Sequence, residues 1–139
     1  MISFNYEVDF QLNSEERVAK WLSNVIEFED FREGEISYVF CSDEYLHKLN
    51  VEFLNHDTLT DIISFDYAVG KELHGEMFIS IERVKENAEN FNEEFENELK
   101  RVMVHGILHY CGYKDKSKKE AIIMREKENY HIDQFTSIQ

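Results

Sequence analysis

The chain has 139 residues, a length typical of one folded domain. Its formal charge of −14 excludes an electrostatic grip on nucleic acid by the whole surface, so any such binding needs a local basic patch. Hydrophobic residues make up 42% of the chain and include 11 Phe and 7 Tyr, which is enough to build a core and argues against disorder.

The two cysteines and the N-terminal residues bear on the compartment. Cys41 and Cys111 do not form the dense pattern of a disulfide scaffold, so we expect reduced thiols in the cytoplasm. Acidic residues among the first positions exclude a signal peptide. No apolar run approaches the roughly 18 residues that a membrane span needs. We therefore expect a cytoplasmic protein that does not bind a membrane.

The first third of the chain is predicted to form two strands and a helix. Apolar residues alternate with polar ones over 1–10 and again over 35–42, the period of a strand with one buried face. Between them Asn13 or Ser14 caps an amphipathic helix. Its apolar residues lie at helical spacing up to about residue 27.

The middle of the chain reads as a short helix and a hairpin. The helix begins at 42–44, and 51–59 is predicted to be a loop because it lacks a period. The apolar run at 61–67 predicts a central strand. A turn at 69–71 then leads to an antiparallel partner strand at 73–80.

The last third is predicted to be helical. One face advances in steps of three and four through Val84, Ala88, Phe91, Phe95, Leu99, Val102, Gly106 and His109. This face belongs either to one long helix or to two helices broken near 91–92, where 92–94 form a second cap. Gly112 is a helix stop, and 116–135 form a final helix. The order β-α-β-α-β-β-α-α-α predicts an α/β fold, with 1–139 as one domain and a small mixed β-sheet packed by helices.

His105 and His109 are predicted to form a metal site at the end of the central helix. Four residues apart, they point the same way with Cβ atoms about 6 Å apart, which suits two imidazoles on one metal. Asp115, after the turn at Gly112, is the nearest third ligand, and the set would leave an open position for water. Alternatively the two histidines only pack in the core. Cys111 could also ligate, although it is more typical of a buried apolar thiol.

The residues around this pair of histidines argue against peptide cleavage. Gly106 stands where HExxH peptidases carry their glutamate base. The sequence does not identify a general base, so we expect a water bound to the metal to act as the nucleophile. Basic residues cluster nearby, either as phosphate contacts or as a solvated face, and Lys114, Lys116 and Arg101 are the substrate-binding candidates. Further groups that could orient the substrate are Asp61, Ser64 and Glu76.

The same stretch resembles the YbeY family of bacterial endoribonucleases, which act in ribosomal RNA maturation. HGILHYCGY followed by an acid is similar to the family signature HGxLHLxGYxH. Upstream, TDIISF at 60–65 is similar to T-[DN]-V-L-S-F, and GEMFIS at 75–80 to G-D-I-x-I-S. Leu49 and Asn50 resemble the LN that ends the family's second helix. The resemblance covers about residues 36–130.

The resemblance implies a zincin-like domain with one divalent ion, usually Zn²⁺, held by His105, His109 and Asp115. It also implies single-strand endoribonuclease activity in 16S rRNA 3′-end processing and in ribosome maturation and quality control. The partners would be rRNA and the small ribosomal subunit. Two positions depart from the family pattern: Asp115 replaces a third histidine, and Leu54 stands where the family usually has an arginine suited to a phosphate.

Two other functions stay open on the sequence. One is a zinc peptidase, against which Gly106 counts. The other is a non-enzymatic ribosome assembly factor that is stabilised by its metal. Leu54 and the charge of −14 favour this second hypothesis, in which the acidic surface faces basic ribosomal proteins.

Overall fold

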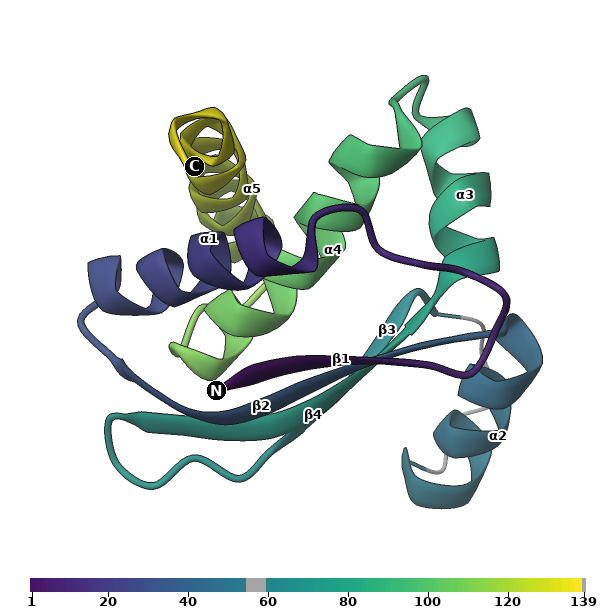
Figure 1. Cartoon of the computed structure of the whole chain (residues 1–139), viewed down its shortest axis with the longest axis horizontal. Helices are drawn as coiled ribbons and strands as arrows, with labels where there is room; N and C mark the ends of the chain where they lie inside the picture. The colour runs from purple at the N-terminus through teal and green to yellow at the C-terminus, as the bar shows by residue number, and fades with distance from the viewer. Residues whose placement is uncertain (55–59, 139) are drawn as a thin grey trace.

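A computed structural model describes residues 1–54 and 60–138, and its elements follow the predicted order (Figure 1). The strands are β1 (Ile2–Tyr6), β2 (Arg32–Cys41), β3 (Ile62–Asp66) and β4 (Glu72–Ser80). The helices are α1 (Glu15–Phe28), α2 (Asp43–Leu54), α3 (Ile81–Asn90), α4 (Phe95–Tyr110) and α5 (Lys118–Gln134), followed by the short 3-10 helix η1 (Phe135–Ser137).

The four strands form one mixed sheet in the order β1-β2-β4-β3, as the predicted fold class requires. β1 and β4 both run parallel to β2, whereas β3 pairs antiparallel with β4, so the predicted hairpin is confirmed. The prediction that the 61–67 run is a central strand is wrong, because β3 lies at an edge. Its residues are apolar because helices cover both faces: Ile62 packs on the main core, and Ile63 packs with Leu46 of α2.

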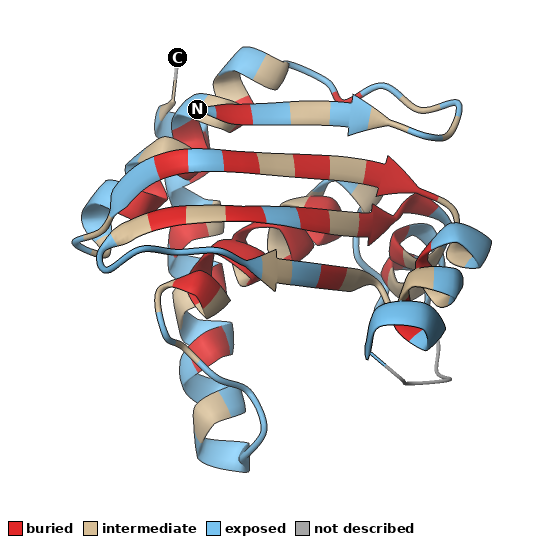
Figure 2. Ribbon diagram, turned by 90° about the horizontal axis from the view of Figure 1, so that it is seen from below, coloured by how far each residue is buried: buried red, intermediate tan, exposed pale blue. Residues whose placement is uncertain are grey.

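Most of the helices lie on one side of the sheet. Figure 1 shows α1, α3, α4 and α5 on that side, with α2 on the other side of the sheet. Buried and exposed residues alternate along the strands in Figure 2, as the period of two predicts. Among the helices of the described residues, none is long and apolar enough to cross a membrane.

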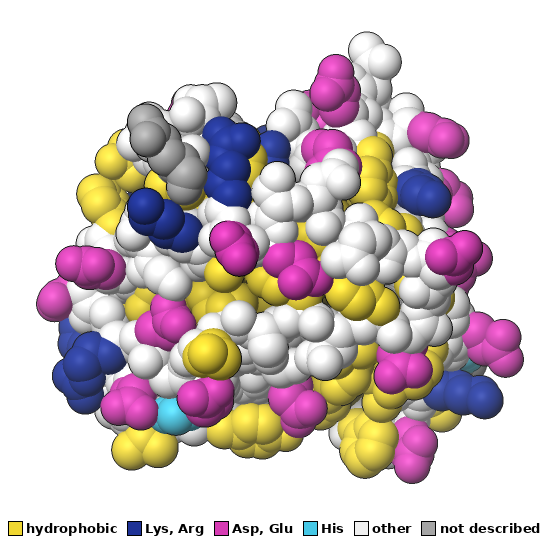
Figure 3. Space-filling model, viewed as in Figure 1, with side chains coloured by type: hydrophobic (Ala, Val, Ile, Leu, Met, Phe, Trp, Pro, Cys, Tyr) yellow, Lys and Arg dark blue, Asp and Glu magenta, His cyan; other side chains and the backbone are white. Residues whose placement is uncertain are grey.

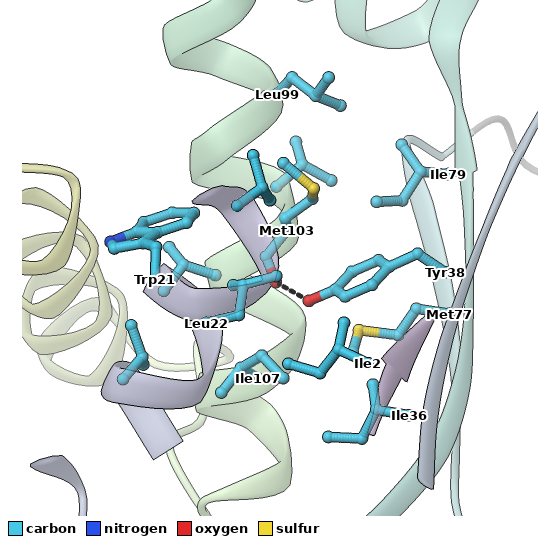
Figure 4. Packing of buried hydrophobic residues seen from close by; sticks show 14 of the residues in the cluster. Ile2, Trp21, Leu22, Ile36, Tyr38, Met77, Ile79, Leu99, Met103 and Ile107 are labelled. Carbon is cyan, nitrogen blue, oxygen red and sulfur yellow. Dashed lines mark hydrogen bonds between the residues drawn. The ribbon is translucent and has the colours of Figure 1, made fainter. Parts of the chain in front are cut away.

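The main core lies between the sheet and helices α1 and α4 (Figure 4). Trp21 and Leu22 of α1 belong to the same cluster as Tyr38 and Met77 of the sheet, and all four are almost fully buried. Burying a side chain of this size contributes about 2 kcal/mol. The Tyr38 hydroxyl donates to the Met103 carbonyl oxygen at 2.7 Å, which ties β2 to the middle of α4. The helix that carries the two predicted histidine ligands is thereby fixed over the sheet.

Several predicted boundaries need correction. The first strand ends at Tyr6 rather than at residue 10, although Phe10 still packs on the core. The long helical face belongs to two helices, and Asn92, with φ of 55°, turns the chain between them. Helix α2 continues to Leu54, so the loop prediction is wrong for 51–54, while 55–59 lie outside the described residues.

We expect Gly75→Ala to destabilise the fold by about 1–3 kcal/mol. A Cβ at this position of β4 would overlap the Tyr110 hydroxyl and the Phe65 carbonyl oxygen, which are already joined by a 2.9 Å hydrogen bond. Urea unfolding measures the change. Glu76→Ala at the neighbouring exposed position is the control and should shift stability by less than about 0.5 kcal/mol. Equal effects of the two changes would contradict the steric explanation.

Candidate metal centre

The end of α4 presents His105 and His109 to one point. They lie one turn apart on the same face, and their ring centroids are 4.5 Å apart with an interplanar angle of 80°. Gly112, with φ of 100°, ends the helix because this backbone conformation suits glycine. Its amide donates to the His109 carbonyl and that of Tyr113 to the Leu108 carbonyl, which is a Schellman motif. The chain therefore turns back toward the two imidazoles.

Asp115 lies at the end of this turn and faces both histidines. Its Oδ2 is 3.2 Å from His105 Nε2 and 3.6 Å from His109 Nε2. One donor atom from each of the three residues lies within 4.8 Å of the other two. A tetrahedral ion with ligand bonds of about 2.0 Å places its ligand atoms about 3.3 Å apart, so the carboxylate spacing fits such an ion. The donor set of two imidazoles and a carboxylate is also one that zinc accepts.

Glu128 of α5 orients His105 from behind. The ring Nδ1–H donates to Glu128 Oε2 at 2.6 Å, which leaves Nε2 directed at Asp115. The acid is only 4% exposed, and its other oxygen accepts from Arg101 Nη1 at 3.2 Å. A carboxylate behind a ligand histidine fixes both the tautomer and the ring orientation. The sequence reasoning missed Glu128, although it lies in helical step with the buried Met124.

The charges around the two imidazoles shift their pKa values in opposite directions. Burial opposes the charged form of His105, but the hydrogen bond and charge of Glu128, together with the charges of Asp115 and Asp61, raise its pKa overall. Burial and then the neighbouring His105 lower the pKa of His109. The surroundings of His109 therefore favour its neutral form, which is the form of imidazole that binds a metal.

A second buried acid holds the loop that carries Asp115. Glu29, at the end of α1, accepts from the Tyr113 hydroxyl at 2.8 Å and lies 2.8 Å from His131 Nε2. Lys127 Nζ is 3.3 Å from the same carboxylate. Burial alone would raise the Glu29 pKa, but these partners lower it, so the acid stays ionised. Tyr113 is thus anchored two residues before Asp115.

The predicted substrate-binding residues divide into two kinds. Lys114 and Lys116 are exposed on the loop beside Asp115. Arg101 instead points inward to Glu128 and to the Asn129 side chain, at 2.8 Å from its Oδ1.

The other residues predicted to orient the substrate lie partly in the cleft and partly outside it. Asp61 lines the same cleft as His105, and burial raises its pKa, whereas Glu76 lines a hollow on the other face of the sheet. Ser64 is exposed on β3. Leu54 is exposed at the end of α2, where it offers no donor to a phosphate.

Known proteins resemble this chain over nearly its whole length. The sequence model of the family described as Endoribonuclease YbeY matches residues 3–136. A relative from Flavobacterium johnsoniae, named Endoribonuclease YbeY, is 63% identical over 97% of this chain and 97% of its own. One from Flavobacterium psychrophilum with the same name is 58% identical over 97% and 96%.

A solved structure shares the fold. The solution structure of TM1509 from Thermotoga maritima aligns with a TM-score of 0.69 and 30% identity, over 97% of this chain and 89% of that one. The α/β architecture with its mixed sheet is therefore found in an experimentally determined relative.

Proposed function

The chain belongs to the Endoribonuclease YbeY family, and from this we propose that it is a metal-dependent endoribonuclease that cuts single-stranded RNA. The observation that carries the proposal is the convergence of His105, His109 and Asp115 on one point at the edge of a cleft. The substrate is rRNA, in 16S 3′-end processing and in the maturation and quality control of the small subunit. Residues 1–139 act as one hydrolase domain in the cytoplasm, where that RNA is made.

The ion proposed for the site is a single Zn²⁺, held by the three side chains. Bound there, it would lower the pKa of a water and polarise a phosphoryl oxygen. The protein's own groups do the positioning. Glu128 binds the Nδ1–H of His105, so that Nε2 is the nitrogen aimed at the site, while Tyr113, bonded to Glu29, anchors the loop of Asp115.

The contacts to the RNA backbone are proposed to come from the basic residues around the site. Lys114 and Lys116 are exposed beside Asp115 and offer mobile ammonium groups to phosphate oxygens. Arg101, held by Glu128, contributes its positive charge from within the cleft. These groups replace the guanidinium that Leu54 cannot supply.

Chelation is expected to abolish cleavage. The purified protein should contain about one zinc per chain, and removing it should stop the cutting of a single-stranded RNA until zinc is added back. Gel analysis of a labelled RNA measures this, with a duplex of the same sequence and a peptide library as alternative substrates. Cleavage that survives complete metal removal would overturn the proposed mechanism. Digestion of peptides instead would point to the peptidase.

A non-enzymatic assembly factor is the second candidate. Acidic side chains are spread over the face in Figure 3, between smaller groups of Lys and Arg, which suits contact with basic ribosomal proteins. Co-sedimentation with small subunits separates the two functions. Stable binding without cleavage of bound or free RNA would favour the assembly factor.

A further inference from the structure

A groove runs along α4 away from the three candidate ligands and is lined by residues of α3, α4 and α5. Figure 1 shows α3 and α5 on opposite sides of α4. It has a volume of about 370 Å³ and is lined by His105 and Asp115. Asn87 of α3 and Phe91, the C-cap of that helix, also line it. Small-ligand sites span about 300–1,000 Å³, so this one suits a single nucleotide unit and not a folded partner.

Phe91 is an unusual residue for the wall of a polar groove. It is 62% exposed and belongs to neither core cluster. Phe28 and Phe53 are similarly exposed, but they pack against Tyr130 and Phe65. Within residues 1–54 and 60–138, Phe91 has no aromatic neighbour of this kind. A free aromatic face beside a cleft is the platform on which proteins stack the bases of single-stranded RNA.

Glu98 lies in the same groove and lacks an ordinary partner. It is only 5% exposed, and its nearest positive group is Arg101 Nε at 3.9 Å, beyond hydrogen-bond distance. No hydrogen bond to its carboxylate is found in the described part of the chain. Buried acids are normally hydrogen-bonded, so an acid without a bond in a groove points to a ligand that donates. Every base edge carries at least one N–H donor, but only guanine presents two side by side, N1–H and N2–H2, which one carboxylate can accept together.

Two further features bear on where an RNA strand would lie in the groove. Glu98 is seven residues before His105, which is about 10 Å along the helix axis. Arg125, on the α5 wall, is 58% exposed at its side chain and lies 3.7 Å from Glu128. Its guanidinium can therefore meet a phosphate while it remains close to the buried acid.

We propose that this groove is a nucleotide subsite, in which Phe91 stacks on a base, Glu98 accepts from the edge of that base and Arg125 contacts a phosphate. The base next to the cut is then preferentially guanine, the base that offers two adjacent N–H donors to one carboxylate. This inference rests on the proposed endoribonuclease function and adds to it the place of the flanking nucleotide.

The stacking contact is tested by binding. A short single-stranded RNA carries the fluorescent base 2-aminopurine at one position, which is varied along the strand, and EDTA prevents cutting. We expect the full-length protein to quench the fluorescence strongly at one position only. Phe91→Ala should remove this quenching and weaken binding about 10-fold, since a stacked base contributes about 1–3 kcal/mol. Phe91→Trp should retain both the quenching and the affinity, and Phe28→Ala, a similarly exposed control, should leave both unchanged.

Cleavage by the zinc-loaded protein gives the second readout. Phe91→Ala should raise KM about 10-fold with little change in kcat, because the ring binds the strand away from the reacting atoms. Glu98→Gln should reduce the preference for guanine, measured on RNAs that differ at one base. If Phe91→Ala binds and cuts like Phe28→Ala, the subsite is wrong even though cleavage is intact. If quenching is as expected but zinc never produces cleavage, the proposed function fails and the subsite stands.

Discussion

His109→Ala is expected to lower zinc affinity by about 100-fold or more and to abolish RNA cleavage. The change removes one of three candidate ligands, and the loss of even an outer partner of a ligand typically costs 10–100-fold. His109 is also the imidazole whose pKa is lowered by burial and by His105, which favours the neutral form that binds a metal. Metal content after dialysis and zinc competition with a coloured chelator measure the affinity, and a labelled RNA measures the activity.

His74→Ala is the matched control for this prediction. His74 is another partly buried histidine with a carboxylate neighbour, since its Nε2 lies 2.7 Å from Glu72, but it lies on the sheet and not at the end of α4. We expect it to leave zinc content and cleavage at the level of the unmodified protein. A His109→Ala protein that still retains one zinc and cuts RNA normally would show that the ion is held elsewhere.

The sequence predicts well what local geometry determines. Helical periodicity fixes the relative direction of His105 and His109, and Gly112 marks the turn after them. The position of Asp115 follows because only a few residues separate it from that turn. The alternation of β2 places Ile36 and its apolar partners on the helix-covered face for the same local reason. That these side chains bind a metal remains a prediction.

What the sequence does not predict depends on packing between distant elements. The apolar run of β3 resembles that of a central strand, because periodicity cannot distinguish a strand between two strands from an edge strand covered by α2 and α4. The length of α2 was underestimated since its outer residues are exposed and show no apolar period. Glu128 was missed because a charged residue in a polar helix is expected in solvent, and only the docking of α5 on α4 buries it.

Glu128 therefore supplies the second large prediction. Glu128→Ala is expected to destabilise the fold by about 3 kcal/mol, because it leaves Arg101, whose side chain is largely buried, without its hydrogen-bonded carboxylate. Glu128→Gln keeps the shape and can still accept a hydrogen bond, so it should cost less stability. Both variants should weaken zinc binding about 10- to 100-fold, because the ring of His105 loses the charge that holds its orientation.

The effect on zinc must be separated from the effect on folding. Glu128→Gln is the informative variant: if Glu128 positions His105, its zinc affinity falls while its unfolding midpoint without metal stays close to that of the unmodified protein. Glu126→Gln, an exposed acid on the same helix, removes the same charge from α5 and should change neither quantity. Equal zinc affinities of the unmodified protein, Glu128→Gln and Glu126→Gln would mean that Glu128 only neutralises the largely buried Arg101 and does not position His105. A loss confined to Glu128→Gln would show that the two histidines and Asp115 bind zinc tightly only when the Glu128 carboxylate holds the ring of His105.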